Sequence, residues 1–353
     1  MMTNNIRTWL QHLITLPSFS REEDQTADYL SNILDKAGIR ISRIKNNLIG
    51  KSTYWSDEKP TLLLNSHHDT VKPVESYTRD PFKATVEDDR LYGLGSNDAG
   101  ASLCCLMQVF IDYHNRQDLP FNLLFIASAE EEISGQNGIE LVLKSTPPIW
   151  GAIVGEPTRM KAAVAERGLM VVDGQSIGKS GHAARKEGIN AIDLAIEDIR
   201  TIQNIRFDKK SEFLPDTQAI VTQIEAGSQH NVIPDSCRFV IDVRVNDQYS
   251  NQEVFHILKE AVKSELTARS FRLNSSSLPK DHALYKVVEK LDLKPFGSPT
   301  LSDQALMNFP SLKIGPGDSA RSHTADEFVL LSEIEEGYSG YKLIIENLIK
   351  VLS

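Results

Sequence analysis

The first half of the chain alternates helical patterns with short, continuously apolar runs. Apolar positions recur at helical spacing over 24–36, ending before Gly38, and again over about 99–114. The apolar runs are "TLLLNSH", "NLLFIASAEEE" and "GAIVGEPT". Runs without polar alternation are typical of strands buried on both faces, as in a mainly parallel sheet flanked by helices. The pattern predicts an α/β fold for this part of the chain.

From about Arg167 the pattern changes to βαββαβ. Strands are predicted at "LMVVDGQSIG", "TQAIVTQIEAG", "CRFVIDVRV" and "SFRLNS", with helices at "NAIDLAIEDIRTIQNI" and "QEVFHILKEAVKSEL". This order is typical of a ferredoxin-like α+β unit, in which two helices cover one face of an antiparallel sheet. A chain of 353 residues also favours two domains over one. We predict a main domain of 1–166 and 278–353 and an inserted domain of 167–277.

Composition narrows the partners and the location. The net charge of -10 and the isoelectric point near 5.5 argue against a nucleic-acid or anionic-membrane partner. The N-terminal segment predicts an amphipathic helix rather than a signal peptide, with these residues on one face: Trp9, Leu10, Leu13 and Ile14. No run approaches the roughly 18 apolar residues that span a bilayer, so we expect a cytoplasmic protein. The cysteines lack metal-ligand spacing and are predicted to be buried: Cys104, Cys105 and Cys237.

Polar residues follow each apolar run of the first half. His67 and Asp69 come after the first run, Glu131 and Glu132 after the second, and Glu156 after the third. Ligands gather at the carboxyl ends of strands in parallel sheets, so these side chains fall where a site is expected. Like charges packed at a buried strand end raise each other's pKa and cost stability unless a cation neutralises them.

Asp98 and His323 complete a set that suits divalent cations. Together with His67, Glu132 and Glu156 they supply two imidazoles and three carboxylates, which suit a pair of ions such as zinc. Two ions about 3.5–4 Å apart need a shared ligand, and a carboxylate with two oxygens can bridge them. Asp98, in the loop "YGLGSNDAG", is the natural candidate for that bridge.

Each of these residues alone also has a structural interpretation. Asp98 precedes a predicted helix and could be its N-cap. The run Glu130–Glu132 could be a solvated charge cluster, Glu156 a loop acid before Pro157, and His323 a surface histidine.

The motifs that carry the candidates occur in a characteristic order: "SHHDTV", "YGLGSNDAG", "SAEEEIS", "VGEPT", "SGHAARKEG", "HNVIPDS", "DVR" and "GPGDSARSHTADE". Over nearly its whole length the chain resembles the M20 metallopeptidase and deacylase family, and in particular its acetylornithine deacetylases and succinyl-diaminopimelate desuccinylases. The resemblance implies a zinc-hydrolase catalytic domain for 1–166 and 278–353 and a dimerisation domain for 167–277. It also implies two divalent metal ions, with zinc expected and cobalt as the alternative.

The resemblance also assigns roles. The implied metal ligands are His67 and Glu156 for one ion, His323 and Glu132 for the other, and Asp98 for both. Glu131 would be the general base, which takes a proton from the attacking water and delivers it to the leaving amine. Asp69 would orient the His67 ring, and His68 would point elsewhere.

Two departures from the family pattern fall beside these residues. Ala99 and Gly100 follow the bridging aspartate, where the family often has a Lys-Gly pair. The acidic motif begins with Glu130 where Asp is common, so the choice of base and ligand depends on alignment by a single residue.

The resemblance extends to two residues of the inserted domain. Related enzymes dimerise through this domain, and a histidine and an asparagine reach into the partner's site; here they are His182 and Asn231. They would support the oxyanion of the tetrahedral intermediate, a role in which each positioned donor contributes about 3–4 kcal/mol. The structural alternatives are a turn cap beside Gly181 for His182 and a turn before Pro234 for Asn231.

Three residues match substrate-binding positions. Arg167 and Arg244 match positions that bind a substrate carboxylate in the desuccinylases, and a guanidinium fork suits bidentate carboxylate binding. An ordinary exposed strand position is the alternative for Arg244. Ser302, in "PTLSDQ", matches a substrate-loop region.

These expectations combine into a two-metal amidohydrolase that forms a homodimer and acts on a small molecule. It would remove the N-acyl group from an N-acyl amino acid, with N-acetylornithine or N-acetylcitrulline as the substrate, in arginine biosynthesis. Removal of a succinyl group and cleavage of a dipeptide are alternatives within the hydrolases. A non-catalytic binding module of the same fold is the alternative from another class, but it would be expected to lack a ligand or the base, and both are present.

Overall fold

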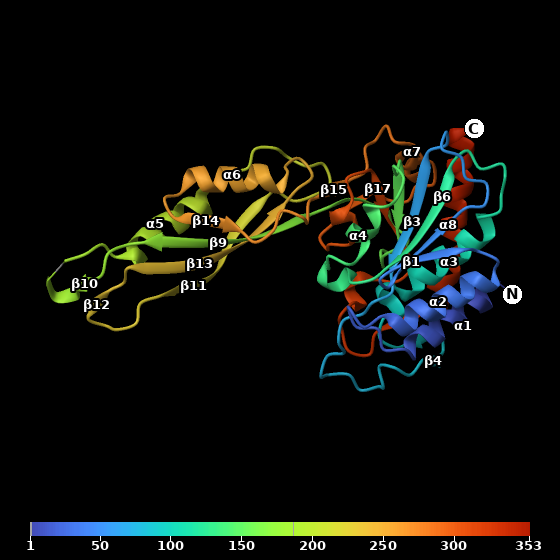
Figure 1. Cartoon of the computed structure of the whole chain (residues 1–353), viewed down its shortest axis with the longest axis horizontal. Coiled ribbons are helices and arrows are strands. Elements are labelled where there is room, and N and C mark those ends of the chain that lie inside the picture. Colours follow the sequence, from blue (N-terminus) through green and yellow to red (C-terminus); the bar gives the residue numbers. More distant parts are fainter. Residues whose placement is uncertain (1, 186) are drawn as a thin grey trace. The chain divides into compact units, whose positions relative to one another are not determined.

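The computed structural model describes residues 2–185 and 187–353, which form two compact units (Figure 1). The first comprises Met1–Val164, Ser277–Phe296 and Ser302–Ser353, and the second comprises Ala165–Ser276 and Gly297–Leu301. The segment 297–301 therefore belongs to the second unit, whereas the sequence placed it in the main domain. A Cβ added at Gly297 would lie 2.2 Å from the carbonyl oxygen of Phe213, so glycine permits this segment's close approach to the second unit.

A mixed sheet with parallel central strands organises the first unit. Its strands are β1 (Ile41–Ile44), β2 (Asn47–Lys51), β3 (Thr61–His67), β6 (Asn122–Ser128), β7 (Gly151–Val154), β8 (Ala163–Glu166), β15 (Ser276–Ser277), β16 (Phe296–Ser298) and β17 (Ser311–Lys313). Their order is β1-β2-β6-β3-β7-β17-β8-β15, with β16 beside β8. The pairs β6–β3, β3–β7 and β7–β17 are parallel, which confirms the predicted α/β class.

Helices cover both faces of this sheet. They are α1 (Met2–Ile14), α2 (Asp24–Lys36), α3 (Ala101–Tyr113), α4 (Ile139–Leu143), α7 (Ala283–Lys290) and α8 (Leu331–Leu352). Helix α3 packs on β3 and β6 and against α1 and α8, while α4 belongs to a separate apolar cluster with strand residues such as Leu63. A small separate sheet contains β4 (Thr85–Glu87), β5 (Arg90–Tyr92) and β18 (Phe328–Leu330). None of the helices in the described part of the chain is long and apolar enough to cross a membrane.

Burial on both faces explains the continuous apolarity of the central strands. Every residue of β3 and β6 is buried, and Leu62, Leu63 and Leu64 are 0% exposed. Burying each leucine contributes about 1.5–3 kcal/mol to stability. Side chains that must reach a substrate or a metal ion can therefore lie only at the ends of these strands.

The N-terminal helix forms as predicted, but its buried face differs by one residue. Ile6, Leu10, Leu13 and Ile14 are buried, whereas Trp9 is only partly buried. Positions i, i+4, i+7 and i+8 share one helix face, so Ile6 takes the place that the sequence analysis gave to Trp9.

The second unit has the predicted βαββαβ order. Its elements are β9 (Gly168–Ile177), β10 (Gly181–His182), α5 (Ala191–Asn204), β11 (Gln218–Ala226), β12 (Val232–Ile233), β13 (Ser236–Val245), α6 (Asn251–Ala261) and β14 (Glu265–Ala268). The antiparallel sheet runs β11-β13-β9-β14, and Figure 1 shows α5 and α6 on the same face of it. Strands β10 and β12 form a separate short pair.

The last strand of this unit was predicted at the wrong place. It spans Glu265–Ala268, so it begins in the last two residues of the segment assigned to a helix, and "SFRLNS" is not a strand. Helix α6 ends at Ala261, and Leu266 turns into the core with 6% exposure. The apolar residue that suggested a strand, Phe271, instead packs its ring edge-on against Phe255 of α6, at 5.3 Å between centroids.

Candidate metal centre

The candidate ligands of the first unit meet at the carboxyl ends of the parallel strands. His67 is the last residue of β3, and Glu156 follows β7 by two residues. Glu132 lies in a short 3₁₀ turn, Glu131–Ile133, which begins three residues after β6. Asp98 lies in a π-helical turn, Ser96–Gly100, and His323 in a loop after β17. Parallel neighbours end at the same sheet edge, so residues far apart in sequence converge here.

Asp98 lies between the two histidines. Its Oδ1 is 3.4 Å from Nε2 of His67, and its Oδ2 is 3.6 Å from Nε2 of His323. Each carboxylate oxygen thus faces a different imidazole, as expected of a carboxylate shared by two cations. This arrangement also replaces the N-cap interpretation, because no side-chain capping bond is present at the start of the turn Ser96–Gly100 or of α3.

Glu156 and Glu132 each lie next to a different histidine. Oε1 of Glu156 is 3.8 Å from Nε2 of His67, and Oε2 of Glu132 is 2.9 Å from Nε2 of His323. Ligand atoms of His67, Asp98 and Glu132 all lie within 4.8 Å of one another. The structure therefore brings together all five residues that the sequence analysis named as ligands.

The ring of His67 is oriented for coordination. Its Nδ1 lies 3.0 Å from the carbonyl oxygen of Asp69, which can only accept, so Nδ1 carries a hydrogen and, in the neutral ring that binds a metal, Nε2 presents a lone pair. His67 is 1% exposed, and its Nε2 has no hydrogen-bond partner among the described residues. A buried nitrogen without a partner, aimed at three carboxylates, fits a site for divalent cations.

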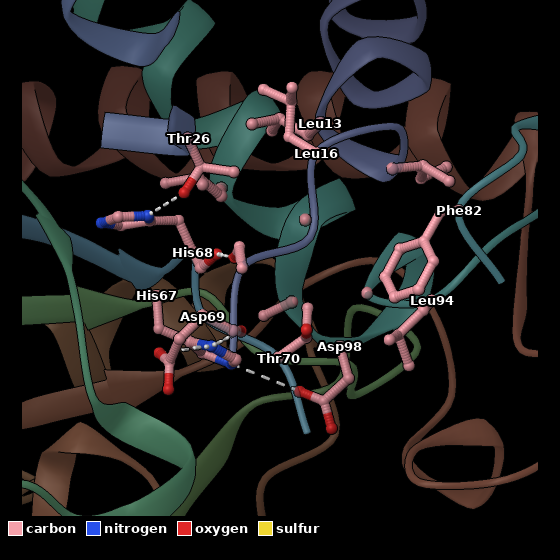
Figure 2. Close-up of a pocket in the computed structure, with 16 residues that line it drawn as sticks. Leu13, Leu16, Thr26, His67, His68, Asp69, Thr70, Phe82, Leu94 and Asp98 are labelled. Carbon is pink, nitrogen blue, oxygen red and sulfur yellow. Dashed lines mark hydrogen bonds and ion pairs between the residues drawn. The ribbon is translucent and has the colours of Figure 1, made fainter. Parts of the chain in front are cut away.

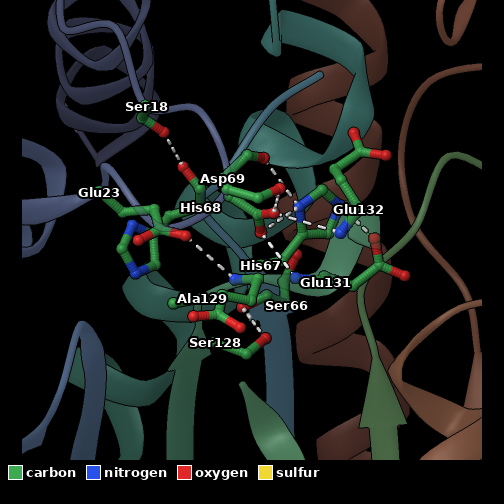
Figure 3. A network of polar contacts seen from close by, with 12 residues as sticks. Ser18, Glu23, Ser66, His67, His68, Asp69, Ser128, Ala129, Glu131 and Glu132 are labelled. Carbon is green, nitrogen blue, oxygen red and sulfur yellow. Dashed lines mark hydrogen bonds and ion pairs between the residues drawn. The ribbon is translucent and has the colours of Figure 1, made fainter. Parts of the chain in front are cut away.

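Asp69 also positions the glutamate turn (Figure 3). Its carboxylate accepts hydrogen bonds from the backbone amides of Glu131 (3.0 Å) and Glu132 (3.2 Å), and from the Ser20 hydroxyl (2.7 Å). Burial opposes the charge of Asp69, but its interactions with His67 hold the pKa of this carboxyl below its ordinary value. Asp69 thus aligns the His67 ring through its carbonyl oxygen and the acidic turn through its carboxylate.

His68 points away from the cluster. Its Nδ1 is 2.8 Å from the Thr26 hydroxyl and its Nε2 is 2.9 Å from the Asn46 carbonyl, and Figure 2 shows its ring directed toward Thr26 while His67 faces Asp98. Burial lowers the pKa of His68 to about 4, so this ring stays neutral. His68 is a satisfied core histidine.

Burial and crowding raise the pKa values of the glutamates near His67, whereas the interactions of Asp98 with His67 lower the pKa of that carboxyl despite burial. Burial is the main cause at Glu131, Glu132 and Glu156, and it raises the pKa of Glu156 to about 8. The pKa of His67 rises despite burial, because Glu131 and the neighbouring aspartates favour the imidazolium. This many carboxylates in one buried pocket are costly unless cations neutralise them.

The comparisons with known proteins agree with this geometry. A family profile described as peptidase family M20/M25/M40 matches residues 63–347. The chain belongs to this family. M20 relatives include an acetylornithine deacetylase of Proteus mirabilis, 28% identical over 96% of this chain and 95% of the relative, and a succinyl-diaminopimelate desuccinylase of Rickettsia bellii, 24% identical over 95% and 94%. A dinuclear metal-binding M20 peptidase of Bacillus subtilis superimposes with a TM-score of 0.75 at 18% identity, covering 99% of this chain and 98% of its own. The M20 protein described here is a metal-dependent hydrolase of amide bonds.

Glu131 is placed close to the candidate ligands without sharing their closest contacts. Its Oε2 is 3.9 Å from Nε2 of His67, and its side chain is 13% exposed. The neighbouring Glu132 contacts His323 at 2.9 Å, so the structure separates the two glutamates that the sequence could distinguish only by alignment. Glu130 points elsewhere, and its carboxylate accepts a hydrogen bond from the Asn137 side chain at 2.9 Å.

The sequence analysis missed three buried acids that support the centre. Glu23 accepts a hydrogen bond from the backbone amide of Glu130 (3.2 Å), and Asp303 accepts one from the Ser128 hydroxyl (2.5 Å). Glu327 accepts three from the turn that carries Asp98. Glu23 precedes a helix and resembles a helix start, and Asp303 and Glu327 lie in polar loops, so only the fold shows what they contact.

The two candidate residues of the inserted domain, His182 and Asn231, lie close to each other. They belong to the second unit, whereas the candidate ligands belong to the first. His182 ends β10, Asn231 precedes β12, and the Ala183 amide donates to the Asn231 carbonyl at 3.0 Å. Nδ1 of His182 accepts from the Ala184 amide at 3.2 Å, which is the turn cap considered as its alternative. Both side chains are exposed, so they remain accessible for another role.

The three predicted substrate-binding residues form hydrogen bonds or ion pairs with other residues of the chain. Arg244 forms a bidentate pair with Asp242, at 2.8 Å and 3.1 Å, and Arg167 donates to the carbonyl oxygens of Asp216 and Arg244. Ser302 is 5% exposed, and its hydroxyl accepts from the Gln304 amide as the N-cap of the turn Asp303–Leu306. These contacts give all three residues a structural explanation.

Proposed function

We propose that this M20 hydrolase removes the acetyl group from an N-acetyl amino acid, with N-acetylornithine or the close analogue N-acetylcitrulline as its substrate, in a step of arginine biosynthesis. The observation that carries the proposal is Asp98, whose two oxygens face two different histidines. The acetylornithine deacetylase of Proteus mirabilis, similar over almost the whole of both chains, supports the substrate class.

We propose the following division of ligands between two zinc ions, with cobalt as a substitute: His67 and Glu156 for one, His323 and Glu132 for the other, and Asp98 for both. The distances within the cluster support this pairing. Bound cations of this kind polarise a carbonyl and lower the pKa of water toward neutrality.

In the reaction, Glu131 acts as the proton carrier. Its carboxylate lies beside the cluster, accepts a proton from the attacking water and returns it to the nitrogen of the leaving amine as the amide bond breaks. Asp69 holds the Glu131 backbone through one oxygen and keeps the lone pair of His67 directed inward. The products are acetate and the free amino acid.

The inserted unit has the features of a dimerisation surface. Its edge strand β11 exposes Ile220 (49%) and Ile224 (56%), and an edge strand with exposed apolar residues is suited to pairing with another strand. We propose a homodimer through this unit, in which His182 and Asn231 serve the partner's site and stabilise its oxyanion. A chain that sediments as a monomer at working concentrations would refute the dimer.

The contacts of Arg244 favour acetyl over succinyl substrates. A succinyl group carries an extra carboxylate, and the fork of Arg244 is already bound to Asp242. The desuccinylase of Rickettsia bellii keeps the succinyl reaction as the second candidate.

Turnover of a substrate panel tests the proposal. Zinc-loaded protein is assayed for release of free amine from the acetyl and succinyl forms of ornithine, citrulline, lysine and diaminopimelate, together with simple dipeptides. We expect the highest kcat/KM for acetylornithine or acetylcitrulline. Preference for a succinyl form would establish the second candidate, and no turnover of any member would refute the hydrolysis of N-acyl amino acids.

A further inference from the structure

Glu327 connects the two loops that carry Asp98 and His323. The side chain is 2% exposed and lies four residues after His323, just before β18. Its Oε1 accepts from the backbone amides of Asn97 (2.8 Å) and Asp98 (2.9 Å), and its Oε2 accepts from that of Gly95 (3.0 Å). Three backbone donors of the Asp98 loop therefore converge on one carboxylate from the His323 loop.

Asn97 and Gly93 join the two loops as well. The Asn97 side chain donates to the Asp318 carbonyl at 3.1 Å and accepts from the Asp318 amide at 2.9 Å. The Gly93 amide donates to the Glu327 carbonyl at 3.0 Å. Gly95 adopts φ 72, a left-handed conformation that glycine takes without strain, so that its amide can face Glu327. The contacts fix the backbone of Asp98 against the chain that leads from His323.

A carboxylate suits this position better than a neutral side chain. It offers two acceptor oxygens to three amides, whereas a glutamine would turn an NH₂ group toward at least one of the donors. A buried anion next to Asp98 is nevertheless repelled by it, so the loop carries an electrostatic cost. Cations held by Asp98 and His323 would offset that cost, which ties Glu327 to the site rather than to the fold alone.

We propose that Glu327 is a positioning residue that fixes Asp98 relative to His323 and thereby sets the affinity of the chain for its pair of divalent cations. The inference rests on the proposed two-metal function. Residues that orient metal ligands typically change metal affinity 10- to 100-fold when they are replaced. Glu327 acts on the bridging ligand, so it affects both cation positions.

The test compares Glu327→Gln with Asp198→Asn. Asp198 is a matched control in the second unit: it is 5% exposed, and its carboxylate accepts from the backbone amides of Lys263 (3.1 Å) and Ser264 (2.7 Å). Zinc per chain and each dissociation constant are measured by competition with a chromophoric chelator, and the ligand field is followed in the visible spectrum of the cobalt-loaded protein.

We expect Glu327→Gln to weaken zinc binding about 10- to 100-fold and to alter the cobalt spectrum. Asp198→Asn should leave both unchanged, even where it lowers the unfolding midpoint. Zinc dissociation constants in Glu327→Gln equal to those of the wild type would overturn the inference, as would equal weakening in both variants. A wild type that binds no zinc would instead refute the two-metal function.

Circular dichroism of the metal-free variants shows whether they fold. If Glu327→Gln does not fold, Glu327→Asp keeps the charge but shortens the reach by one methylene. We expect weaker zinc binding than in the wild type, because a shorter side chain cannot reach all three amides. Unchanged binding in Glu327→Asp would contradict the inference equally.

Discussion

The candidate metal centre and the sheet of the inserted unit differ in what neutralises their acidic residues. In the inserted unit, Asp173 pairs with Arg269 and Asp242 with Arg244, each at 2.8 Å and with both partners partly exposed. At the candidate metal centre, Asp98, Glu131 and Glu156 are largely buried, and the ion pairs found for them within the described residues are to histidines. Acids that a protein neutralises internally stabilise it slightly, whereas buried acids with incomplete neutralisation indicate a cation from outside the chain.

Replacing the proton carrier should give the largest effect. Glu131→Gln keeps the shape of the side chain but cannot accept a proton, so we expect kcat/KM to fall about 10²- to 10⁴-fold. Zinc stoichiometry should be unchanged. Asp173→Asn is the control from the other unit, and its kcat/KM should match that of the wild type. A Glu131→Gln protein with full activity would move the base to another residue.

The next largest effect should distinguish the adjacent histidines His67 and His68. We expect His67→Ala to lose zinc affinity and activity, because it removes a ligand nitrogen aimed into the cluster. His68→Ala should keep zinc and activity but lose about 1–3 kcal/mol of unfolding free energy, because its buried partners Thr26 and Asn46 lose a hydrogen bond. Zinc titrations and urea unfolding measure the two effects. Loss of zinc in His68→Ala with retention in His67→Ala would overturn the assignment.

The smallest effect is the pH dependence of the metal-free protein. Burial raises the pKa of Glu156 from 4.5 to about 8, and a hydrogen bond to Glu132 raises the pKa of His323 from 6.5 to about 9. A raised folded-state pKa gives stability that is full below the unfolded value and is lost as pH rises through the folded value. The low pKa of His68 has the opposite effect, a gain in stability as pH rises from about 4 to 6.5, and this effect fades above 6.5.

The unfolding midpoint of metal-free protein should therefore fall between pH 6.5 and 8. Zinc should reverse the trend, because its ligands bind when deprotonated and because a ligand at 100 times its dissociation constant adds about 2.7 kcal/mol. Thermal unfolding at several pH values, with chelator or with zinc, measures this. A metal-free midpoint that rises over this range would contradict the proposed crowding of buried acids.

The sequence predicted the strands and site residues that follow from a local pattern of apolar and polar positions. Continuous apolar runs revealed β3, β6 and β7, and the polar residues at their ends included three of the five candidate ligands, His67, Glu132 and Glu156. The last strand was missed because "QEVFHILKEAVKSEL" keeps helical spacing beyond the point where α6 ends at Ala261. Glu23, Asp303 and Glu327 were missed because their partners are backbone amides or hydroxyls distant in sequence. Such contacts leave no periodic pattern, so they depend on the tertiary fold.

The path of the chain into the inserted unit has a consequence for how such proteins diversify. The Leu278 amide donates to the Val164 carbonyl at 2.8 Å, so the chain leaves the first unit and returns to it at neighbouring points. All five candidate ligands belong to the first unit. Apart from the short segment 297–301, the second unit is therefore one insertion, and such an insertion can be exchanged between relatives while its host keeps folding. Evolution can thus alter the inserted unit and leave the inherited chemistry of the first unit intact.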